Sequence, residues 1–312
     1  MVSWTAGRGR GDTVGGMSSA PLFGRVLTAM VTPMFPDGRV DLDGAQRLAT
    51  HLVAHGHDGL IVSGTTGESP TTSDAEKDQL LRAVIEAVGD RSHIVAGVGS
   101  NNTAHSVDNA QAAAKAGAHG VLVVTPYYNK PPQEGLLRHF TAVADASELP
   151  VMVYDIPGRS GIAIHTETLL RLAEHPRIRA VKDAKGDLFA SSQVMARSDL
   201  QYYSGDDVLN LAHLTQGAVG IASVVGHVAG PQYAEMVAAV AGGDLPRAIA
   251  LHRQLIPAVN AVMNITQGAI MAKAALRELG VIASAAVRLP LVEATADQVA
   301  LVRDGLRQSG LT

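Results

Sequence analysis

The sequence predicts an α/β fold, a (β/α)8 (TIM) barrel with a small C-terminal helical module. Three observations predict it: short apolar runs recur between residues 26 and 223, amphipathic stretches separate them, and no such run follows residue 243. The length of 312 residues suits one barrel of about 250 residues plus an appendage, although two ordinary domains would also fit.

Each apolar run contains β-branched or small residues without polar alternation, which is typical of parallel strands buried on both faces. Eight runs predict eight strands, at residues 26–31, 59–62, 93–98, 120–124, 150–154, 178–182, 200–204 and 219–223. An open, doubly wound sheet is the alternative. It normally carries a glycine-rich phosphate-binding turn after its first strand, whereas the first run here ends in Thr32-Pro33. The closed barrel is therefore favoured.

The stretches between the runs have the pattern of amphipathic helices. Residues 41–55 place leucine and alanine side chains on one face, and residues 73–88 open with Ser73 and Glu76 in the spacing of a capping box. Residues 103–116 and 133–147 follow the same logic, so helices are expected to connect the strands.

The last part of the chain predicts further helices, at residues 246–256, 258–279 and 296–308. We expect residues 21–243 to form the catalytic barrel and residues 244–312 the helical module. Residues 1–20 are expected to be a disordered tail, or extra sequence upstream of a start at Met17.

Composition excludes several classes of function. The chain has no cysteine, which rules out disulfides, thiolate metal sites and cysteine nucleophiles. A net charge of −4 without a basic cluster argues against nucleic acid, and no apolar run approaches the ~18 residues of a membrane span. The N-terminus lacks the apolar stretch of a signal peptide. We therefore expect a cytoplasmic protein without nucleic-acid or membrane partners.

Reactive side chains follow the ends of several predicted strands, where a barrel places its active site. The segments are SGTTGES at 63–69, TPYYN at 125–129, YDIPGR at 154–159, Lys182-Asp183, and SGDD at 204–207, whose aspartates are expected to cap the next helix. No group of His, Asp and Glu there has the spacing of a metal site. Hydroxyls, one lysine and one arginine are thus expected on one rim.

Lys182 is the most informative of the six lysines, because it alone ends a buried apolar run. The other five fall on predicted helices or loops, where the ammonium can stay in water. Burial lowers the pKa of a lysine and yields a neutral amine that attacks carbonyls, the usual route to a Schiff base. The alternative is a structural lysine paired with Asp183 or Glu68, and spacing alone does not separate the two.

Other side chains on this rim suit carboxylate binding and proton transfer. Residues 64–67 (GTTG) either gather N–H groups and hydroxyls around a small anion or form a simple tight loop. Arg159 suits a carboxylate clamp, or is an ordinary solvated side chain. Tyr128 and Tyr154 could each supply a phenol for proton transfer, although buried tyrosines are more often core residues.

The order and spacing of these motifs resemble the dihydrodipicolinate synthase family of pyruvate-dependent class I aldolases. The resemblance rests on GTTGES, TPYYN, YDIPGR, the lysine ending the sixth strand, and SGDD, and covers roughly residues 24–311. It implies a lyase of lysine and diaminopimelate biosynthesis that condenses pyruvate with L-aspartate 4-semialdehyde. It also implies a homotetramer made of two tight dimers, and a reaction that needs no metal or organic cofactor.

The resemblance implies roles for the catalytic residues. Lys182 would form the imine with pyruvate, and Tyr154 beside it would give and take protons. Thr65 would link Tyr154 to Tyr128, which reaches in from the neighbouring subunit of a tight dimer.

It likewise implies the residues that bind the substrates. Thr66 would hold the pyruvate carboxylate, and Arg159 the carboxylate of aspartate semialdehyde. Gly205 and Ala222 would line the pocket through their backbone.

Two alternatives to this activity remain at the sequence level. Sibling aldolases that cleave sialic acid or keto-deoxy sugar acids share the loop and the lysine, but usually lack the arginine at position 159 because their second substrate is a polyol. A catalytically silent, metabolite-binding barrel is the alternative from another class. The lysine, both tyrosines and Arg159 argue against it, since a binder needs no buried nucleophile.

The chain departs from the family pattern at a few positions. Asp155 stands where many members carry Asn, and Gly158 where many carry Ser. Lysine-inhibited members place histidines on the helix after GTTGES and an acidic residue on the next one, where this chain has Asp74, Lys77 and His105. Lys77 would repel a cationic effector, so we expect weak or absent feedback by lysine.

Overall fold

The computed structural model describes residues 20–312, in which eight parallel strands close into a barrel. Neighbours in sequence are neighbours in the barrel, and β1 pairs with both β2 and β8. The strands are β1 (Val26–Ala29), β2 (Gly59–Val62), β3 (His93–Gly97), β4 (Gly120–Val124), β5 (Val151–Asp155), β6 (Ile178–Asp183), β7 (Gln201–Ser204) and β8 (Gly220–Ser223). The predicted barrel is confirmed, and the doubly wound alternative is wrong.

The strands are buried on both faces, which explains their unbroken apolar runs. One set of side chains, including Leu27, Val95 and Met152, fills the barrel interior. The other set, including Leu60 and Val153, packs against the surrounding helices. Because side chains alternate along a strand, a residue two positions beyond an interior residue points into the mouth of the barrel.

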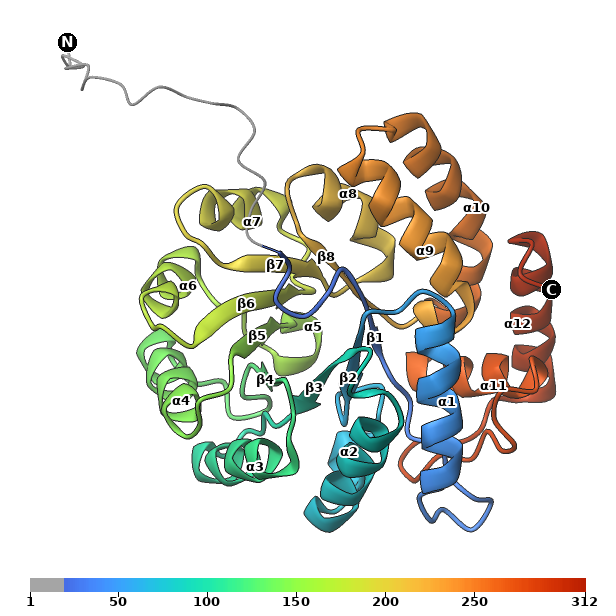
Figure 1. Ribbon diagram of the computed structural model, residues 1–312, viewed down its shortest axis with the longest axis horizontal. Coiled ribbons are helices and arrows are strands. Elements are labelled where there is room, and N and C mark those ends of the chain that lie inside the picture. The colour runs from blue at the N-terminus through green and yellow to red at the C-terminus, as the bar shows by residue number, and fades with distance from the viewer. Residues whose placement is uncertain (1–19) are drawn as a thin grey trace.

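Helices encircle the strands (Figure 1). They are α1 (Leu42–Ala54), α2 (Asp74–Val88), α3 (Thr103–Ala116), α4 (Gln133–Asp145), α6 (Thr166–Ala173), α7 (Leu188–Met195), α8 (Asn210–Thr215) and α9 (Gly226–Ala241). The predicted capping box is confirmed, because Ser73 and Glu76 exchange hydrogen bonds at the start of α2. Short segments η1 (Ser69–Thr71), α5 (Pro157–Ser160) and η2 (Asp207–Leu209) follow β2, β5 and β7.

The C-terminal part comprises α10 (Leu245–Met263), α11 (Gly268–Glu278) and α12 (Ala296–Gln308), which lie on one side of the barrel (Figure 1). The predicted break between residues 256 and 258 is wrong, because α10 continues through Pro257. Burial of Leu255 and Ala258 on either side holds the helix together although the proline lacks one hydrogen bond. The chain turns instead at residues 264–267.

The expected boundary at residue 243 falls between the end of α9 at Ala241 and the start of α10 at Leu245. The tail expected at residues 1–20 lies, except for Ala20, outside the described residues. Between residues 20 and 312, no single helix is long and apolar enough to cross a membrane; α10 and α11 meet that criterion only as a pair bent by 112°.

Candidate active site

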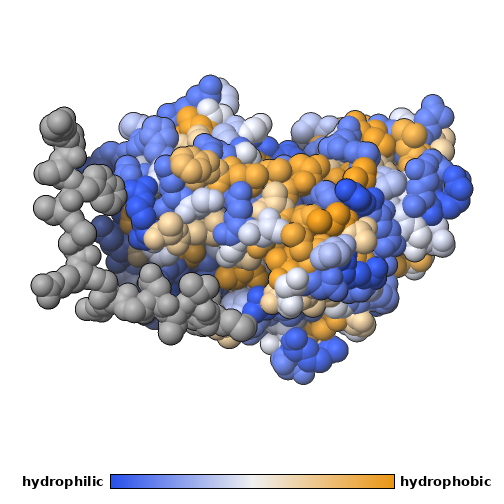
Figure 2. Space-filling model, turned by 90° about the horizontal axis from the view of Figure 1, so that it is seen from above, coloured by the Kyte–Doolittle hydropathy of each residue, from blue (hydrophilic) through white to orange (hydrophobic). Residues whose placement is uncertain are grey.

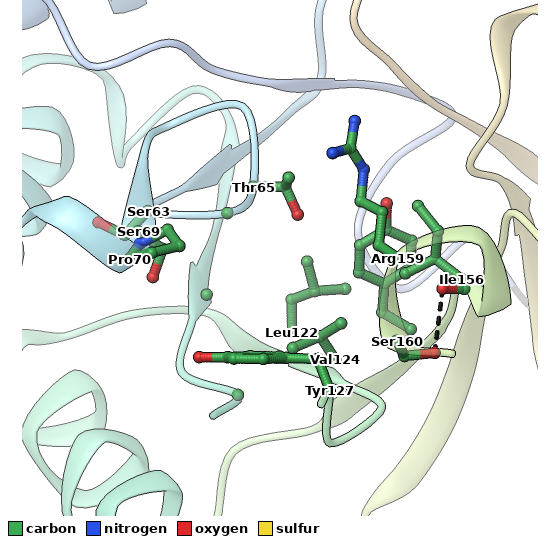
Figure 3. A pocket seen from close by; sticks show the side chains of 14 residues that line it. Ser63, Thr65, Ser69, Pro70, Leu122, Val124, Tyr127, Ile156, Arg159 and Ser160 are labelled. Atoms are coloured by element: carbon green, nitrogen blue, oxygen red, sulfur yellow. Dashed lines mark hydrogen bonds between the residues drawn. The ribbon is translucent and has the colours of Figure 1, made fainter. Parts of the chain in front are cut away.

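A cavity opens where the strands end, and strand alternation supplies part of its wall (Figure 3). Tyr154 lies two residues beyond the interior residue Met152, and Val124 two residues beyond Leu122. The cavity holds ≈ 230 Å³, below the 300 Å³ at which pockets for drug-sized ligands begin. Its size therefore suits small metabolites.

Two loops face each other across this cavity. Figure 3 shows Ser69 and Pro70, which follow β2, on the left of the cavity and Arg159, from α5, on the right, with Thr65 between them and the ring of Tyr127 near the bottom of the view. The turn that carries Arg159 is fastened by Ser160, whose hydroxyl donates to the carbonyl of Ile156 at 3.0 Å. A hydroxyl and a guanidinium are thus both available to a molecule bound in the cavity.

Lys182 lies beside Tyr154, two residues beyond the interior residue Ala180 on β6. It is 4% exposed, and its Nζ lies 4.4 Å from the centroid of the Tyr154 ring. Burial lowers the pKa of Lys182 from 10.5 to about 8, while Asp207 raises it and Arg159 lowers it further. The amine is therefore far more often neutral at neutral pH than that of an exposed lysine.

The structural alternative for Lys182 is wrong, because both carboxylates it invoked are taken. Glu68 pairs with Lys273. Asp183 accepts a hydrogen bond from the hydroxyl of Ser191 at 2.6 Å and from a backbone N–H at 2.8 Å. Within residues 20–312, no side-chain hydrogen bond or ion pair holds the Lys182 amine.

The expectation that the other five lysines keep their ammonium groups in water is wrong for two of them. Lys273 on α11 is fully buried against Glu68. Lys185 lies 3.3 Å from Asp155, and its side chain is 10% exposed. The apolar residues on both sides of Lys273 (GAIMAKAAL) are the sequence signal for its burial.

Tyr154 is buried beside the lysine and carries the opposite shift. Burial raises the pKa of Tyr154 to about 12, and Asp206 adds to this, whereas Arg159 and a hydrogen bond with the Thr65 side chain lower it. The phenol is therefore protonated at neutral pH and can donate a proton to a group formed on Lys182.

The loop that carries Thr65 and Thr66 is a compact, strained turn. Ser63 and Glu68 flank it, and both adopt the left-handed region at φ 58°, which is rare for residues with a side chain. The N–H of Glu68 donates to the carbonyl of Thr65 at 3.1 Å. Thr65 lines the cavity, and Thr66 is buried next to it. Strain of this kind concentrates at functional sites.

Gly205 and Ala222, which were predicted to line the pocket through their backbone, lie at different depths in the barrel. Gly205 touches Lys182: a Cβ at this position would lie 2.8 Å from its Cγ and 3.1 Å from its Cε, so a side chain would displace the lysine. Ala222 lies deeper, packed among the side chains of the barrel interior.

Of the predicted site residues, Thr65, Tyr154 and Arg159 line the cavity; Lys182, Thr66, Gly205 and Ala222 are not among the lining residues, and neither is Tyr128. The Tyr128 side chain is 89% exposed, and its backbone is left-handed at φ 74°. Tyr127, the neighbouring residue that the sequence did not single out for the active site, lines the cavity instead.

The two aspartates after β7, Asp206 and Asp207, have different structural roles. Asp206 caps η2 by accepting from the N–H of Val208, as expected. The expectation is wrong for Asp207, which is buried and accepts from the N–H groups of Val224 and Val225 at 2.8 and 3.0 Å, tying β7 to the chain after β8. Within residues 20–312, no three His, Asp or Glu side chains gather as a metal ion would require.

Two residues that depart from the family pattern, Asp155 on β5 and Gly158 on α5, leave the cavity open. Asp155 points away from it, where it contacts Lys185 and accepts from the N–H of Ile164 at 3.2 Å. Burial raises the pKa of Asp155 to about 6, and Lys185 opposes this. A Cβ at Gly158 would meet no atom within 4 Å, so the usual serine would fit.

A closed (β/α)8 barrel whose mouth holds a buried amine, with no side-chain partner among residues 20–312 and next to a phenol and an arginine, defines an enzyme of the class I aldolase type. The family model agrees over nearly the whole of the described chain. The chain belongs to the dihydrodipicolinate synthetase family, whose model matches residues 22–309.

Named relatives and solved structures are similar over the same span. The 4-hydroxy-tetrahydrodipicolinate synthase of Kineococcus radiotolerans is 64% identical over 289 residues, covering 93% of this chain and 94% of the relative. The structure of the Cyanidioschyzon merolae synthase with lysine bound has a TM-score of 0.90 at 41% identity and covers 93% and 99% of the two chains. The chloride-inhibited Acinetobacter baumannii synthase, complexed with pyruvate, has a TM-score of 0.89 at 34% identity and covers 94% and 100%.

Proposed function

We propose that this enzyme condenses pyruvate with L-aspartate 4-semialdehyde through a Schiff base on Lys182, in lysine and diaminopimelate biosynthesis. The observation that carries the proposal is the Lys182 amine: it is buried, unpaired within the described chain and 4.4 Å from the Tyr154 ring. A buried amine without a carboxylate partner is poised to attack a carbonyl.

The reaction follows from these groups. The Lys182 nitrogen attacks the carbonyl carbon of pyruvate, and the carbonyl oxygen leaves as water to give an iminium. Loss of a methyl proton yields the enamine, whose carbon bonds to the aldehyde carbon of the second substrate while the aldehyde oxygen takes a proton. The amine of that substrate then attacks the imine carbon, closes the ring and releases Lys182. Tyr154, protonated at neutral pH, gives and takes the protons.

The carboxylates of the two substrates have separate sites in this scheme. The Thr65-Thr66 turn binds that of pyruvate through backbone N–H groups and hydroxyls. Arg159, which lines the same cavity from α5, binds that of the semialdehyde. A guanidinium at this point favours the carboxylate-bearing semialdehyde over a polyol.

The proposal requires at least a dimer, and we expect a homotetramer in the cytoplasm. Tyr128 completes the proton relay only by entering the site of a neighbouring subunit, and its 89% exposure leaves it free to do so. A second contact surface is supplied by the apolar band in Figure 2, on the side where α7, α8 and α10 lie. Exposed residues there include Phe189, Val208 and Ile256.

The acceptor aldehyde is tested by supplying pyruvate with either aspartate semialdehyde or the aldehyde sugars that sibling aldolases use. We expect consumption of both pyruvate and the semialdehyde, measured by mass spectrometry of the mixture. Lys182→Met should abolish it, whereas Lys115→Met, which removes an exposed lysine of α3, should not. Consumption of a sugar aldehyde in place of the semialdehyde would contradict the proposal.

A further inference from the structure

The loop after β2 is tied to the C-terminal module by Lys273 on α11 and by Arg288, which lies between α11 and α12, both more than 200 positions away in sequence. One carboxylate oxygen of Glu68 accepts from Nζ of Lys273, and the other accepts from the N–H of Arg288 at 2.9 Å. Lys273 also donates to the carbonyl of Ala286 at 2.7 Å. The Arg288 guanidinium donates to the carbonyl of Thr71 at 2.7 Å, so both Glu68 and η1 are fastened from the same side.

Glu68 connects these contacts with the C-terminal module to the residues that line the cavity. Its left-handed backbone is unfavourable for a residue with a side chain, so contacts must hold it there. Its N–H bonds to the carbonyl of Thr65, which lines the cavity. The Lys273 and Glu68 side chains are 0% and 1% exposed. A buried ion pair adds little net stability over an apolar pair, but it fixes one arrangement of the groups it joins.

We propose that Lys273 and Glu68 form a positioning pair, through which the C-terminal helices set the geometry of the Thr65-Thr66 turn and hence the affinity for pyruvate. The inference rests on the proposed function of this turn. Neither residue is catalytic, because their side chains pair with each other and neither lines the cavity. Arg159 belongs to α5 and takes no part in the contacts of Glu68 or Lys273, so the site for the second substrate is independent of the pair.

Two variants separate positioning from stability. Lys273→Met leaves the Glu68 carboxylate buried without its cation, which lowers the melting temperature. Glu68→Gln combined with Lys273→Met removes both charges, so the melting temperature recovers. We expect both variants to need about tenfold more pyruvate for half-maximal borohydride trapping, because the turn is no longer fixed. The KM for the semialdehyde stays within about twofold, since Arg159 is untouched.

The matched control is Arg303→Met, which removes an ion pair with Glu278 inside the same helical module without touching the loop. Its half-saturating pyruvate concentration should equal that of the unmodified protein. Unchanged half-saturation in the double variant, with an adduct on Lys182 in the unmodified protein, would overturn the positioning role. Absence of any adduct in the unmodified protein would instead remove the proposed function, and this inference with it.

Discussion

At the scale of single residues, burial prepares two groups for opposite tasks. Desolvation disfavours the charged form of each, so it lowers the pKa of Lys182 to about 8 and raises that of Tyr154 to about 12. Near neutral pH the lysine therefore supplies some neutral amine for attack, while the tyrosine keeps its proton to give. One apolar environment thus produces both a nucleophile and an acid.

The Lys182 pKa predicts how imine formation depends on pH. Only the neutral amine attacks pyruvate, so the rate should fall about tenfold for each unit below pH ~8 and level off above it. Rapid-mixing measurements of adduct formation between about pH 6 and about pH 10 test this. A rate that does not change with pH over this range would contradict the assignment of Lys182 as a titrating nucleophile.

Replacement of the Tyr154 phenol tests its role as a proton donor. We expect Tyr154→Phe to lower kcat by about 10²-fold, the effect of losing one acid–base group, while the pyruvate adduct still forms. Tyr202→Phe is the control, because Tyr202 is equally buried on β7 but packs outside the barrel interior. Equal kcat values for Tyr154→Phe and Tyr202→Phe would refute the assigned role.

At the scale of elements, α2 and α3 carry the residues from which we expect weak or absent feedback by lysine. Asp74 on α2 lies 3.0 Å from the imidazole of His105 on α3 and 3.5 Å from the ammonium of Lys77. A lysine effector would meet the Lys77 cation, and the nearest carboxylate is already occupied. We expect inhibition by lysine to be weak or absent in initial-rate assays. Half-inhibition at low micromolar lysine would be incompatible with this expectation.

The strands were predictable from the sequence, whereas the continuation of α10 through Pro257 was not. Burial on both faces turns a parallel strand into an unbroken apolar run, which sequence displays directly. A proline costs a helix about 3 kcal/mol, so a break at Pro257 was the local expectation. Packing of Leu255 and Ala258 in the core outweighs that local preference, and only the tertiary structure reveals it.

The site was predictable to the extent that it lies at strand ends. Two of its residues, Tyr154 and Lys182, end apolar runs, Arg159 follows one, and barrel geometry brings such positions together. The tie between Glu68 and Lys273 joins residues 205 positions apart, and no local pattern specifies such a pairing. Tyr128 could be assigned only through the family resemblance, because its proposed place is in another subunit.

At the scale of the whole molecule, two histidines are buried beside the barrel: His227 on α9 and His57 in the loop after α1. The imidazole of His227 accepts from the N–H of Val31 at 3.0 Å, and its other nitrogen contacts the carbonyl of Val224. His57 contacts the carbonyl of Leu52 at 2.8 Å. Burial lowers the pKa of both histidines to about 4. Each is therefore neutral in the folded protein at physiological pH.

These histidines predict how stability depends on pH. Below pH ~6.5 the unfolded chain binds protons at both, whereas the folded protein does so only near pH 4. Their contribution is therefore full above pH 6.5 and lost as the pH falls toward 4, on the order of 3 kcal/mol each. Urea unfolding across this range measures it, and His57→Gln should flatten the slope. A free energy of unfolding that is constant across the range would contradict the prediction.

The central claim, that Lys182 is the nucleophile of a class I aldolase, is tested most directly by trapping. The protein is incubated with pyruvate and reduced with borohydride, and the modified peptide is located by mass spectrometry. We expect the pyruvate-derived mass on Lys182 alone, because Lys273 and Lys185 are held by Glu68 and Asp155. No adduct on the folded protein, or an adduct on Lys185 instead, would contradict the account.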